Sequence, residues 1–127
     1  MSESTKRIIM LIDDSSTNNI LYESILLDEG YEVIICEDAK IALKRLQKDI
    51  PDLIILDLMM PGIDGFHFLE KKKEMPGIVD VPVIMLTARV DRESELKAYE
   101  LGVVGYMVKP VGIAEITEKL KKIFSSK

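Results

Sequence analysis

The sequence predicts an α/β fold of the (βα)5 type, a doubly wound five-stranded parallel sheet with helices on both faces. Five short apolar runs of β-strand type occur along the chain, and a segment with helical spacing of apolar residues follows each of them. The first run, residues 8–12, is apolar at every position, which is typical of a strand buried on both faces. Alternation of this kind implies right-handed βαβ crossovers within one sheet.

The first half of the chain contains predicted strands at residues 8–12, 31–36 and 53–56. The hydroxyls of Ser15, Ser16 and Thr17 can cap a first helix, and Gly30 is expected to end it. The buried stripe of that helix is predicted to be Ile20, Leu21, Ser24, Ile25 and Leu27. A second helix is expected to start at Asp38 and to bury Ala39, Ala42, Leu43 and Leu46.

The second half contains predicted strands at residues 81–86 and 105–108. Turn residues at positions 61–65 precede a helix over 65–74, which Asp64 is expected to cap. Another helix is predicted over 91–101, where Gly102 stops it. The last helix is expected to bury Ile113, Ile116, Leu120, Ile123 and Phe124. Outside these stripes, Cys36 is predicted to be a core residue, His67 a surface residue, and Lys71, Lys72 and Lys73 a solvated helix end.

Composition indicates one soluble domain over residues 1–127, with a core of about 6–125, and favours a cytoplasmic protein. The chain has 17 basic and 22 acidic residues and a net charge of −5, which argues against binding of a nucleic-acid backbone. No apolar run is long enough to span a membrane. Cys36 is the only cysteine, which excludes an intrachain disulfide and a multi-cysteine metal site.

Polar residues stand at the ends of four predicted strands. Asp13 and Asp14 follow the first, Asp57 the third, Thr87 the fourth and Lys109 the fifth. Because parallel strands end at the same edge of a sheet, where ligands bind, these five side chains are expected to share one crevice.

The net charge of this crevice indicates that it binds a cation. Three carboxylates and one ammonium leave a formal charge of −2, and a like-charge pair about 4 Å apart repels by about 4 kcal/mol at an effective dielectric of 20. Carboxylate oxygens at an open site suit Mg²⁺, which often bridges to phosphate. Lys109 and Thr87 could then bind phosphoryl oxygens, and Asp57 could act as the nucleophile in phosphoryl transfer.

The chain closely resembles the receiver domains of two-component response regulators, such as those of the CheY-like group. The resemblance extends from about residue 8 to 124. It rests on four separated motifs: Asp13-Asp14; Asp57 with Met60-Pro61-Gly62 and Asp64-Gly65; Thr87-Ala88; and Gly105-Tyr106-Met107-Val108-Lys109-Pro110. It implies the flavodoxin-like strand order 2-1-3-4-5.

The resemblance also implies roles for single residues. Asp57 would accept a phosphoryl group from a histidine kinase or a histidine phosphotransfer protein. Asp14, Asp57 and the backbone carbonyl of Met59 would ligate Mg²⁺, and Asp13 would act through a water. Lys109 would pair with the phosphoryl group, with a cis bond to Pro110. Thr87 and Tyr106 would be the switch residues.

Activation would then change the surface of the last two helices and the fifth strand for an unknown downstream protein, and the same surface could form a phosphorylation-dependent homodimer. Two positions at the mouth of the site, Met59 and Arg89, are expected to tune the phosphate lifetime, Met59 by shielding and Arg89 by contact. The chain would not be an enzyme on external substrates; it would catalyse only its own phosphoryl transfer and dephosphorylation.

Other functions fit the sequence less well. A phosphatase with an Asp nucleophile typically needs Asp-x-Asp after the first strand, whereas Asp13 and Asp14 are adjacent. A flavin or nucleotide site needs a phosphate-binding loop, and neither GxGxxG nor a P-loop occurs. An inert scaffold would be expected to lack Asp57 or Lys109. A receiver fragment of a larger response regulator or hybrid kinase stays open.

Overall fold

The computed structural model describes residues 6–60, 62 and 64–125 and shows five strands and five helices in strict alternation. The strands are β1 (Ile8–Ile12), β2 (Glu32–Cys36), β3 (Leu53–Leu56), β4 (Val83–Thr87) and β5 (Gly105–Val108). The helices are α1 (Ser16–Asp28), α2 (Ala39–Arg45), α3 (Gly65–Lys72), α4 (Arg92–Glu100) and α5 (Ile113–Ser125). The turn positions Pro61 and Ile63 lie outside the described residues.

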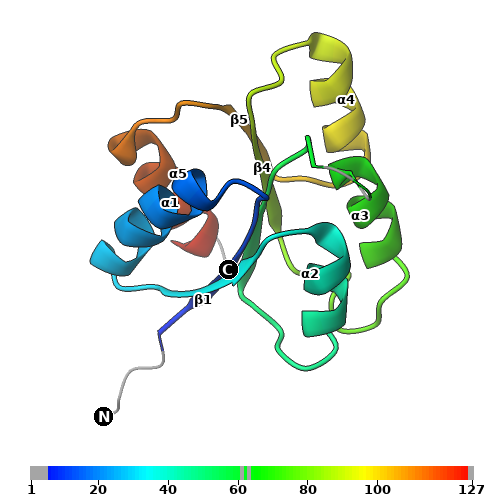
Figure 1. Ribbon diagram of the computed structural model, residues 1–127, viewed down its shortest axis with the longest axis horizontal. Helices are drawn as coiled ribbons and strands as arrows, with labels where there is room; N and C mark the ends of the chain where they lie inside the picture. The colour runs from blue at the N-terminus through cyan, green and yellow to red at the C-terminus, as the bar shows by residue number, and fades with distance from the viewer. Residues whose placement is uncertain (1–5, 61, 63, 126–127) are drawn as a thin grey trace.

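The strands form one parallel sheet in the order β2-β1-β3-β4-β5, which confirms the predicted fold and strand order. Helices α1 and α5 cover one face, and α2, α3 and α4 cover the other (Figure 1). Strand order reverses between β1 and β3, so a crevice is expected beyond their carboxyl ends.

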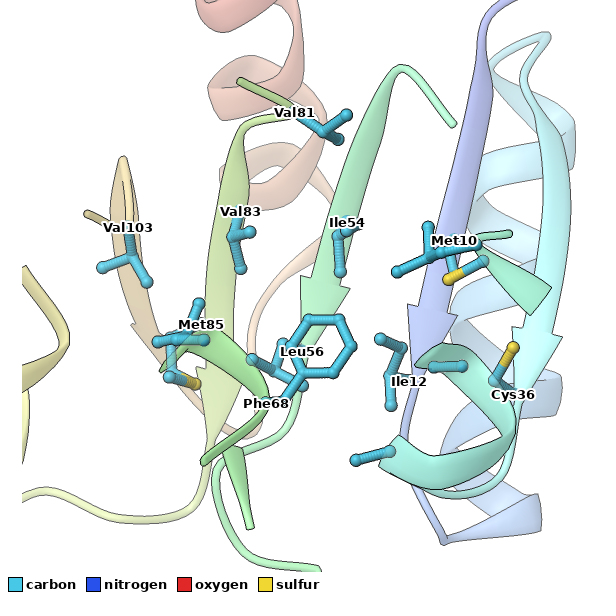
Figure 2. Close-up of a cluster of buried hydrophobic side chains, with 14 of the residues drawn as sticks. Met10, Ile12, Cys36, Ile54, Leu56, Phe68, Val81, Val83, Met85 and Val103 are labelled. Carbon is cyan, nitrogen blue, oxygen red and sulfur yellow. The ribbon is translucent and has the colours of Figure 1, made fainter. Parts of the chain in front are cut away.

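Each face of the sheet has its own apolar core because side chains alternate along a strand. Met10, Ile54 and Met85 pack toward α2, α3 and α4, where Phe68 is fully buried (Figure 2). Ile9, Ile55 and Ile84 pack toward α1 and α5. Cys36 is buried and His67 is exposed, as predicted.

The helix starts follow the predicted caps. Side chains of Ser15, Asp38 and Asp64 each accept a hydrogen bond from a backbone N–H three residues later, and Asp91 does the same for α4. The predicted stops are also confirmed, since Gly30 and Gly102 have φ angles of 92° and 100°, which an L side chain rarely adopts.

The predicted stripe of α1 is wrong. Its buried residues are Asn19, Tyr22, Ile25 and Leu26, whereas the four other predicted members, Ile20, Leu21, Ser24 and Leu27, are exposed. Apolar residues surround most of this helix, so spacing alone did not select the face that meets the sheet. In α5, Ile113 is also exposed, but Ile116, Leu120 and Phe124 are buried as predicted.

Three smaller corrections concern the ends of elements. Strand β4 begins at Val83 rather than Val81, because Val81 donates to Ile78 O in a turn and Pro82 has no N–H. Helix α3 ends at Lys72, two residues early. Lys72 is also not solvated as predicted, since only 8% of it is exposed.

Candidate functional site

The five predicted site residues lie at the same edge of the sheet. Asp13 and Asp57 directly follow the paired strands β1 and β3, whose last partners are Ile12 and Leu56. Thr87 ends β4 and pairs with Val108, which precedes Lys109. The sheet register therefore brings to one place segments that are up to 96 residues apart in the chain, as predicted from the strand ends.

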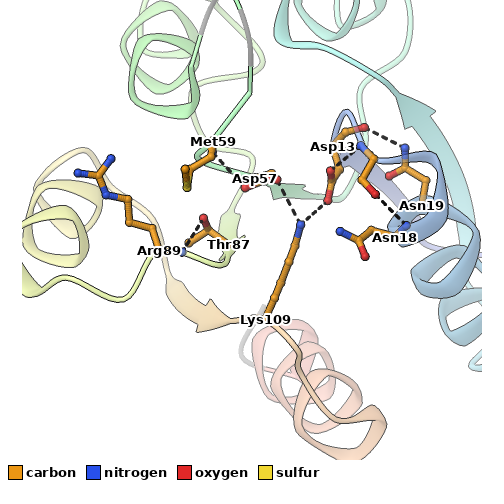
Figure 3. Close-up of polar contacts among 9 residues, drawn as sticks. Asp13, Asn18, Asn19, Asp57, Met59, Thr87, Arg89 and Lys109 are labelled. Atoms are coloured by element: carbon orange, nitrogen blue, oxygen red, sulfur yellow. Dashed lines mark hydrogen bonds and ion pairs between the residues drawn. The ribbon is translucent and has the colours of Figure 1, made fainter.

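Lys109 joins two of the acids. Its Nζ lies 2.6 Å from Oδ2 of Asp13 and 3.2 Å from Oδ2 of Asp57 (Figure 3). These side chains are only 13%, 3% and 9% exposed, so water screens the charges weakly. One ammonium thus compensates two carboxylates that are both nearly buried.

A third carboxylate completes a group that could hold a cation. Ligand oxygens of Asp13, Asp14 and Asp57 all lie within 4.8 Å of one another, and Asp14 is exposed. Three hard oxygen donors with one side open to solvent fit Mg²⁺, which binds through one or two carboxylates and keeps several waters. The residues present therefore fit the predicted metal, with a formal charge of −2 left after Lys109 is counted.

At both Asp57 and Lys109, burial and the neighbouring opposite charges shift the pKa in opposite directions. Burial raises the pKa of Asp57, and the hydrogen bond from Met59 and the charge of Lys109 only partly offset this. Burial would lower the pKa of Lys109, but the bonds to Asp13 and Asp57 prevail and raise it. Lys109 is therefore held as an ammonium between the acids.

Hydrogen bonds from backbone N–H groups two residues later fix the positions of the acids. Asp57 Oδ1 accepts from Met59 N at 3.1 Å, which folds the chain after β3 over the carboxylate. Asp13 Oδ1 accepts from Ser15 N at 2.9 Å. Each acid thus keeps its other oxygen, Oδ2, for Lys109.

Asn19 is a site residue that the sequence did not reveal. Its Nδ2 donates to the main-chain carbonyl of Asp13 at 2.8 Å, and the residue is 3% exposed. Its Oδ1 is buried without a hydrogen-bond partner among the described residues. Asn19 was missed because the predicted stripe turned the opposite side of α1 toward the sheet. The neighbouring Asn18 points its side chain toward Lys109 (Figure 3).

The two predicted switch residues are connected through one residue, Arg89. Thr87 Oγ1 accepts from Arg89 N at 3.2 Å, and the Tyr106 hydroxyl donates to Arg89 O at 2.9 Å. Thr87 is fully buried, whereas Tyr106 is half-buried. A displacement of the segment after β4 would therefore change the hydrogen bonds of both side chains.

The predicted tuning residues lie at the mouth of the site. A cavity of about 380 Å³ is lined by Met59, Phe66 and Arg89, among others, and Met59 is 55% exposed. The Arg89 side chain extends away from Lys109 and pairs with Asp91 at 2.7 Å (Figure 3). The Arg89 guanidinium therefore does not lie beside the carboxylates of the site. The Lys109–Pro110 bond is cis, in agreement with the expectation.

The fold and the site together define a class: doubly wound α/β domains with an acidic, lysine-bridged crevice at the point where strand order reverses. Residues 9–121 match the family model described as "Response regulator receiver domain". The chain belongs to the family of response regulator receiver domains, and the resemblance stated from its motifs is confirmed.

Relatives and solved structures agree with this assignment. The chain is 36% identical over 117 residues to chemotaxis protein CheY-3 of Vibrio cholerae, which covers 91% of this chain and 90% of the relative. It is 38% identical over 103 residues to response regulator PleD of Caulobacter vibrioides, covering 81% of this chain. The structure of Vibrio cholerae CheY4 superposes with a TM-score of 0.88 at 29% identity, covering 93% of this chain and 98% of the other.

Relatives differ in how much of their length the chain covers. It spans 23% of PleD and 51% of the Escherichia coli regulatory protein PhoB, to which it is 32% identical over 117 residues. Receiver domains therefore occur both in proteins of about this size and within longer ones. The family places the chain among phosphorylation-dependent signalling switches of two-component systems.

Proposed function

We propose that this domain is switched by transfer of a phosphoryl group to Asp57. The observation that carries the proposal is the bridge from Lys109 to Asp57 and Asp13, with Asp14 close enough to share a cation. A carboxylate beside a fixed ammonium and a cation site can attack phosphorus while the charge of the transferred group is neutralised.

Each site residue has a specific part in the transfer. A carboxylate oxygen of Asp57 attacks phosphorus, and the bond from phosphorus to the imidazole nitrogen of a phosphohistidine breaks with its electron pair on the imidazole. Lys109 and Thr87 bind phosphoryl oxygens. Asp14, Asp57 and the Met59 carbonyl would hold Mg²⁺, with Asp13 acting through a water. The metal would supply charge neutralisation at the phosphoryl oxygens.

Phosphorylation then changes the contacts among Thr87, Arg89 and Tyr106. Thr87 moves to donate its hydroxyl proton to a phosphoryl oxygen, which draws its oxygen away from Arg89 N, and Tyr106 responds through Arg89 O. The surface of α4, β5 and α5 changes for a downstream protein, or for a second copy of the chain, by a shift in population. The phosphodonor is a histidine kinase or histidine phosphotransfer protein of the cytoplasm.

On this proposal the domain acts on no external substrate. It contacts neither nucleic acid nor membrane, and no helix among the described residues could span a membrane. An alternative is that the same switch operates as the receiver part of a larger regulator or hybrid kinase; the chain spans 23% of PleD and 51% of PhoB. An Asp-nucleophile phosphatase is the weaker alternative.

Phosphorylation of the isolated protein tests the proposal. We expect a single phosphoryl adduct by intact mass after incubation with acetyl phosphate and Mg²⁺, and none in Asp57→Asn. Asp64→Asn is the matched control, because it removes a nearby exposed acid and keeps a side chain that can cap α3. An equal adduct on Asp57→Asn, or none on the parent, contradicts the proposal.

The lifetime of the adduct tests the role of Met59. Because its backbone N–H donates to Asp57 Oδ1, Met59 lies beside the carboxylate, where it shields the acyl phosphate from water. Met59→Asn should therefore shorten the half-life after the phosphodonor is removed. An unchanged half-life contradicts the shielding role and leaves the phosphorylation of Asp57 unaffected.

A further inference from the structure

Lys72 is a buried lysine that takes no part in the site at Asp57. It ends α3, and only 8% of it is exposed, whereas its neighbours Lys71 and Lys73 are exposed. Its Nζ donates to Val79 O at 2.9 Å. The negative charge of the nearby Asp80 stabilises the Lys72 ammonium and raises its pKa. An ammonium has three N–H donors, so two of them have no hydrogen-bond partner in the described part of the chain.

A cavity of about 310 Å³ adjoins this amine. Its apolar walls include Leu69, Val81, Val83, Leu101 and Val104, and the polar side chains of Lys72, Lys73 and Asp80 also line it. The cavity lies at the amino end of β4, and Asp57 lies beyond the carboxyl end of the paired strand β3. Because the strands are parallel, the cavity and the phosphorylation site occupy opposite edges of the sheet.

The environment of Lys72 makes loss of its proton easier than in a solvated lysine. Burial lowers the pKa of Lys72, and the charge of Asp80 only partly offsets this. A neutral amine carries a free electron pair and is the nucleophilic form of lysine. Lys71 is exposed and does not line the cavity, whereas the exposed Lys73 does, so Lys71 is the internal standard for reactivity.

We propose that Lys72 is an acylation site that takes a short acyl group from an acyl phosphate. The ammonium first releases a proton to water, and the amine nitrogen then attacks the acyl carbon. The bond from that carbon to the phosphate oxygen breaks, inorganic phosphate leaves with the electron pair, and the nitrogen loses a second proton to give a neutral amide.

The product fits the site better than the ammonium does. The amide keeps one N–H, which can still donate to Val79 O. The buried positive charge is removed, and with it the cost of keeping an ammonium away from water. The methyl group of an acetyl chain lies against apolar walls in a cavity large enough to take it.

Acetyl phosphate tests this inference without the phosphorylation site. The Asp57→Asn protein is incubated with acetyl phosphate and a metal chelator, and acetylation of each lysine is followed by peptide mass mapping. We expect Lys72 to acetylate several-fold faster than Lys71, which does not line the cavity. Equal or slower modification of Lys72 overturns the proposal, whatever the outcome at Asp57.

Two further measurements connect the reactivity to the fold. In concentrated urea the preference for Lys72 should vanish, and its persistence there contradicts the inference because the sequence alone would then explain it. Val104→Phe should fill the cavity from its partly exposed rim. It should slow acetylation of Lys72 and leave Lys71 unchanged. An unchanged rate at Lys72 contradicts the proposal, because the reagent then does not use the cavity.

Discussion

The Tyr106 hydroxyl donates a hydrogen bond to the main-chain carbonyl of Arg89, 2.9 Å away. Burial, followed by the nearby Asp91 carboxylate, raises the pKa of Tyr106, so the hydroxyl keeps its proton at neutral pH. The N–H of the same Arg89 is bonded to Thr87. One residue thus connects a buried hydroxyl at the site to a half-buried ring on the outer strand.

Removal of this hydroxyl should have a small effect on stability. Tyr106→Phe should lower the free energy of unfolding by about 1 kcal/mol or less, since water can reach the Arg89 carbonyl. The amide resonances of Arg89 and Val90 should shift in NMR spectra. Tyr31→Phe is the matched control, because no described residue is hydrogen-bonded to that hydroxyl. Unshifted resonances in Tyr106→Phe would show that the bond is not formed in solution.

Lys109→Ala should destabilise the metal-free protein by about 1–3 kcal/mol, because Asp13 and Asp57 then remain almost buried without a cation. Mg²⁺ should stabilise this variant more than the parent, since the acids have lost their internal ammonium. Thermal unfolding with and without Mg²⁺ measures both effects. Lys121→Ala removes an exposed ammonium 3.9 Å from Glu29 and should change little. An equal Mg²⁺ effect in Lys109→Ala and the parent counts against the site.

Asn19→Ala should lower the free energy of unfolding by about 1–3 kcal/mol, since the Asp13 carbonyl loses a buried donor. It should also weaken Mg²⁺ binding, because Asn19 holds the turn that positions Asp13 and Asp14. Asn18→Ala is the control on the same helix turn, because among the described residues Asn18 donates a hydrogen bond only through its backbone N–H, to Ser15. Urea unfolding and Mg²⁺ titration test this, and equal effects of the two substitutions would contradict it.

Gly65→Ala should be destabilising although alanine favours helices. A Cβ at Gly65 would lie 2.9 Å from Leu58 Cα and 3.0 Å from Asp57 O, and both atoms are main-chain. Helix propensity offers about 1 kcal/mol, and forced overpacking costs about 1–3 kcal/mol, so the clash should prevail. At Gly112 a Cβ would meet nothing within 4 Å, so Gly112→Ala is the control. Denaturant unfolding and Mg²⁺ titration should show both lower stability and weaker binding only in Gly65→Ala.

Asp91 should contribute stability that depends on pH. The side-chain bond to Arg89, followed by the bonds from Ser94, lowers the pKa of Asp91 from 3.8 to about 2. A lowered pKa in the folded state means that the contribution is complete above pH 3.8 and is lost as the pH falls through about 2. Asp91→Asn should thus melt below the parent at neutral pH, and the difference should shrink toward pH 2. A difference independent of pH would contradict this assignment.

Much of the fold follows from the sequence because its signals are local. The runs at Ile8–Ile12 and Leu53–Leu56 are apolar at every position, so they are buried on either face in any parallel sheet. Asp38 and Asp64 cap helices through bonds that reach only three residues ahead. Placement of Asp13, Asp57, Thr87 and Lys109 at one edge needs only the parallel direction of the strands.

Tertiary structure alone decided which side of α1 and which lysine of α3 turn inward. Apolar residues encircle α1, so Asn19 and Tyr22 are buried and Ile20 is exposed only because of how the helix lies on the sheet. Lys72 has a lysine on either side, so the sequence does not indicate which of the three is buried. The loop that returns to β4 decides this, because it places Val79 O beside the Nζ of Lys72. Side-chain spacing determines local structure, but burial depends on contacts between segments that the spacing does not encode.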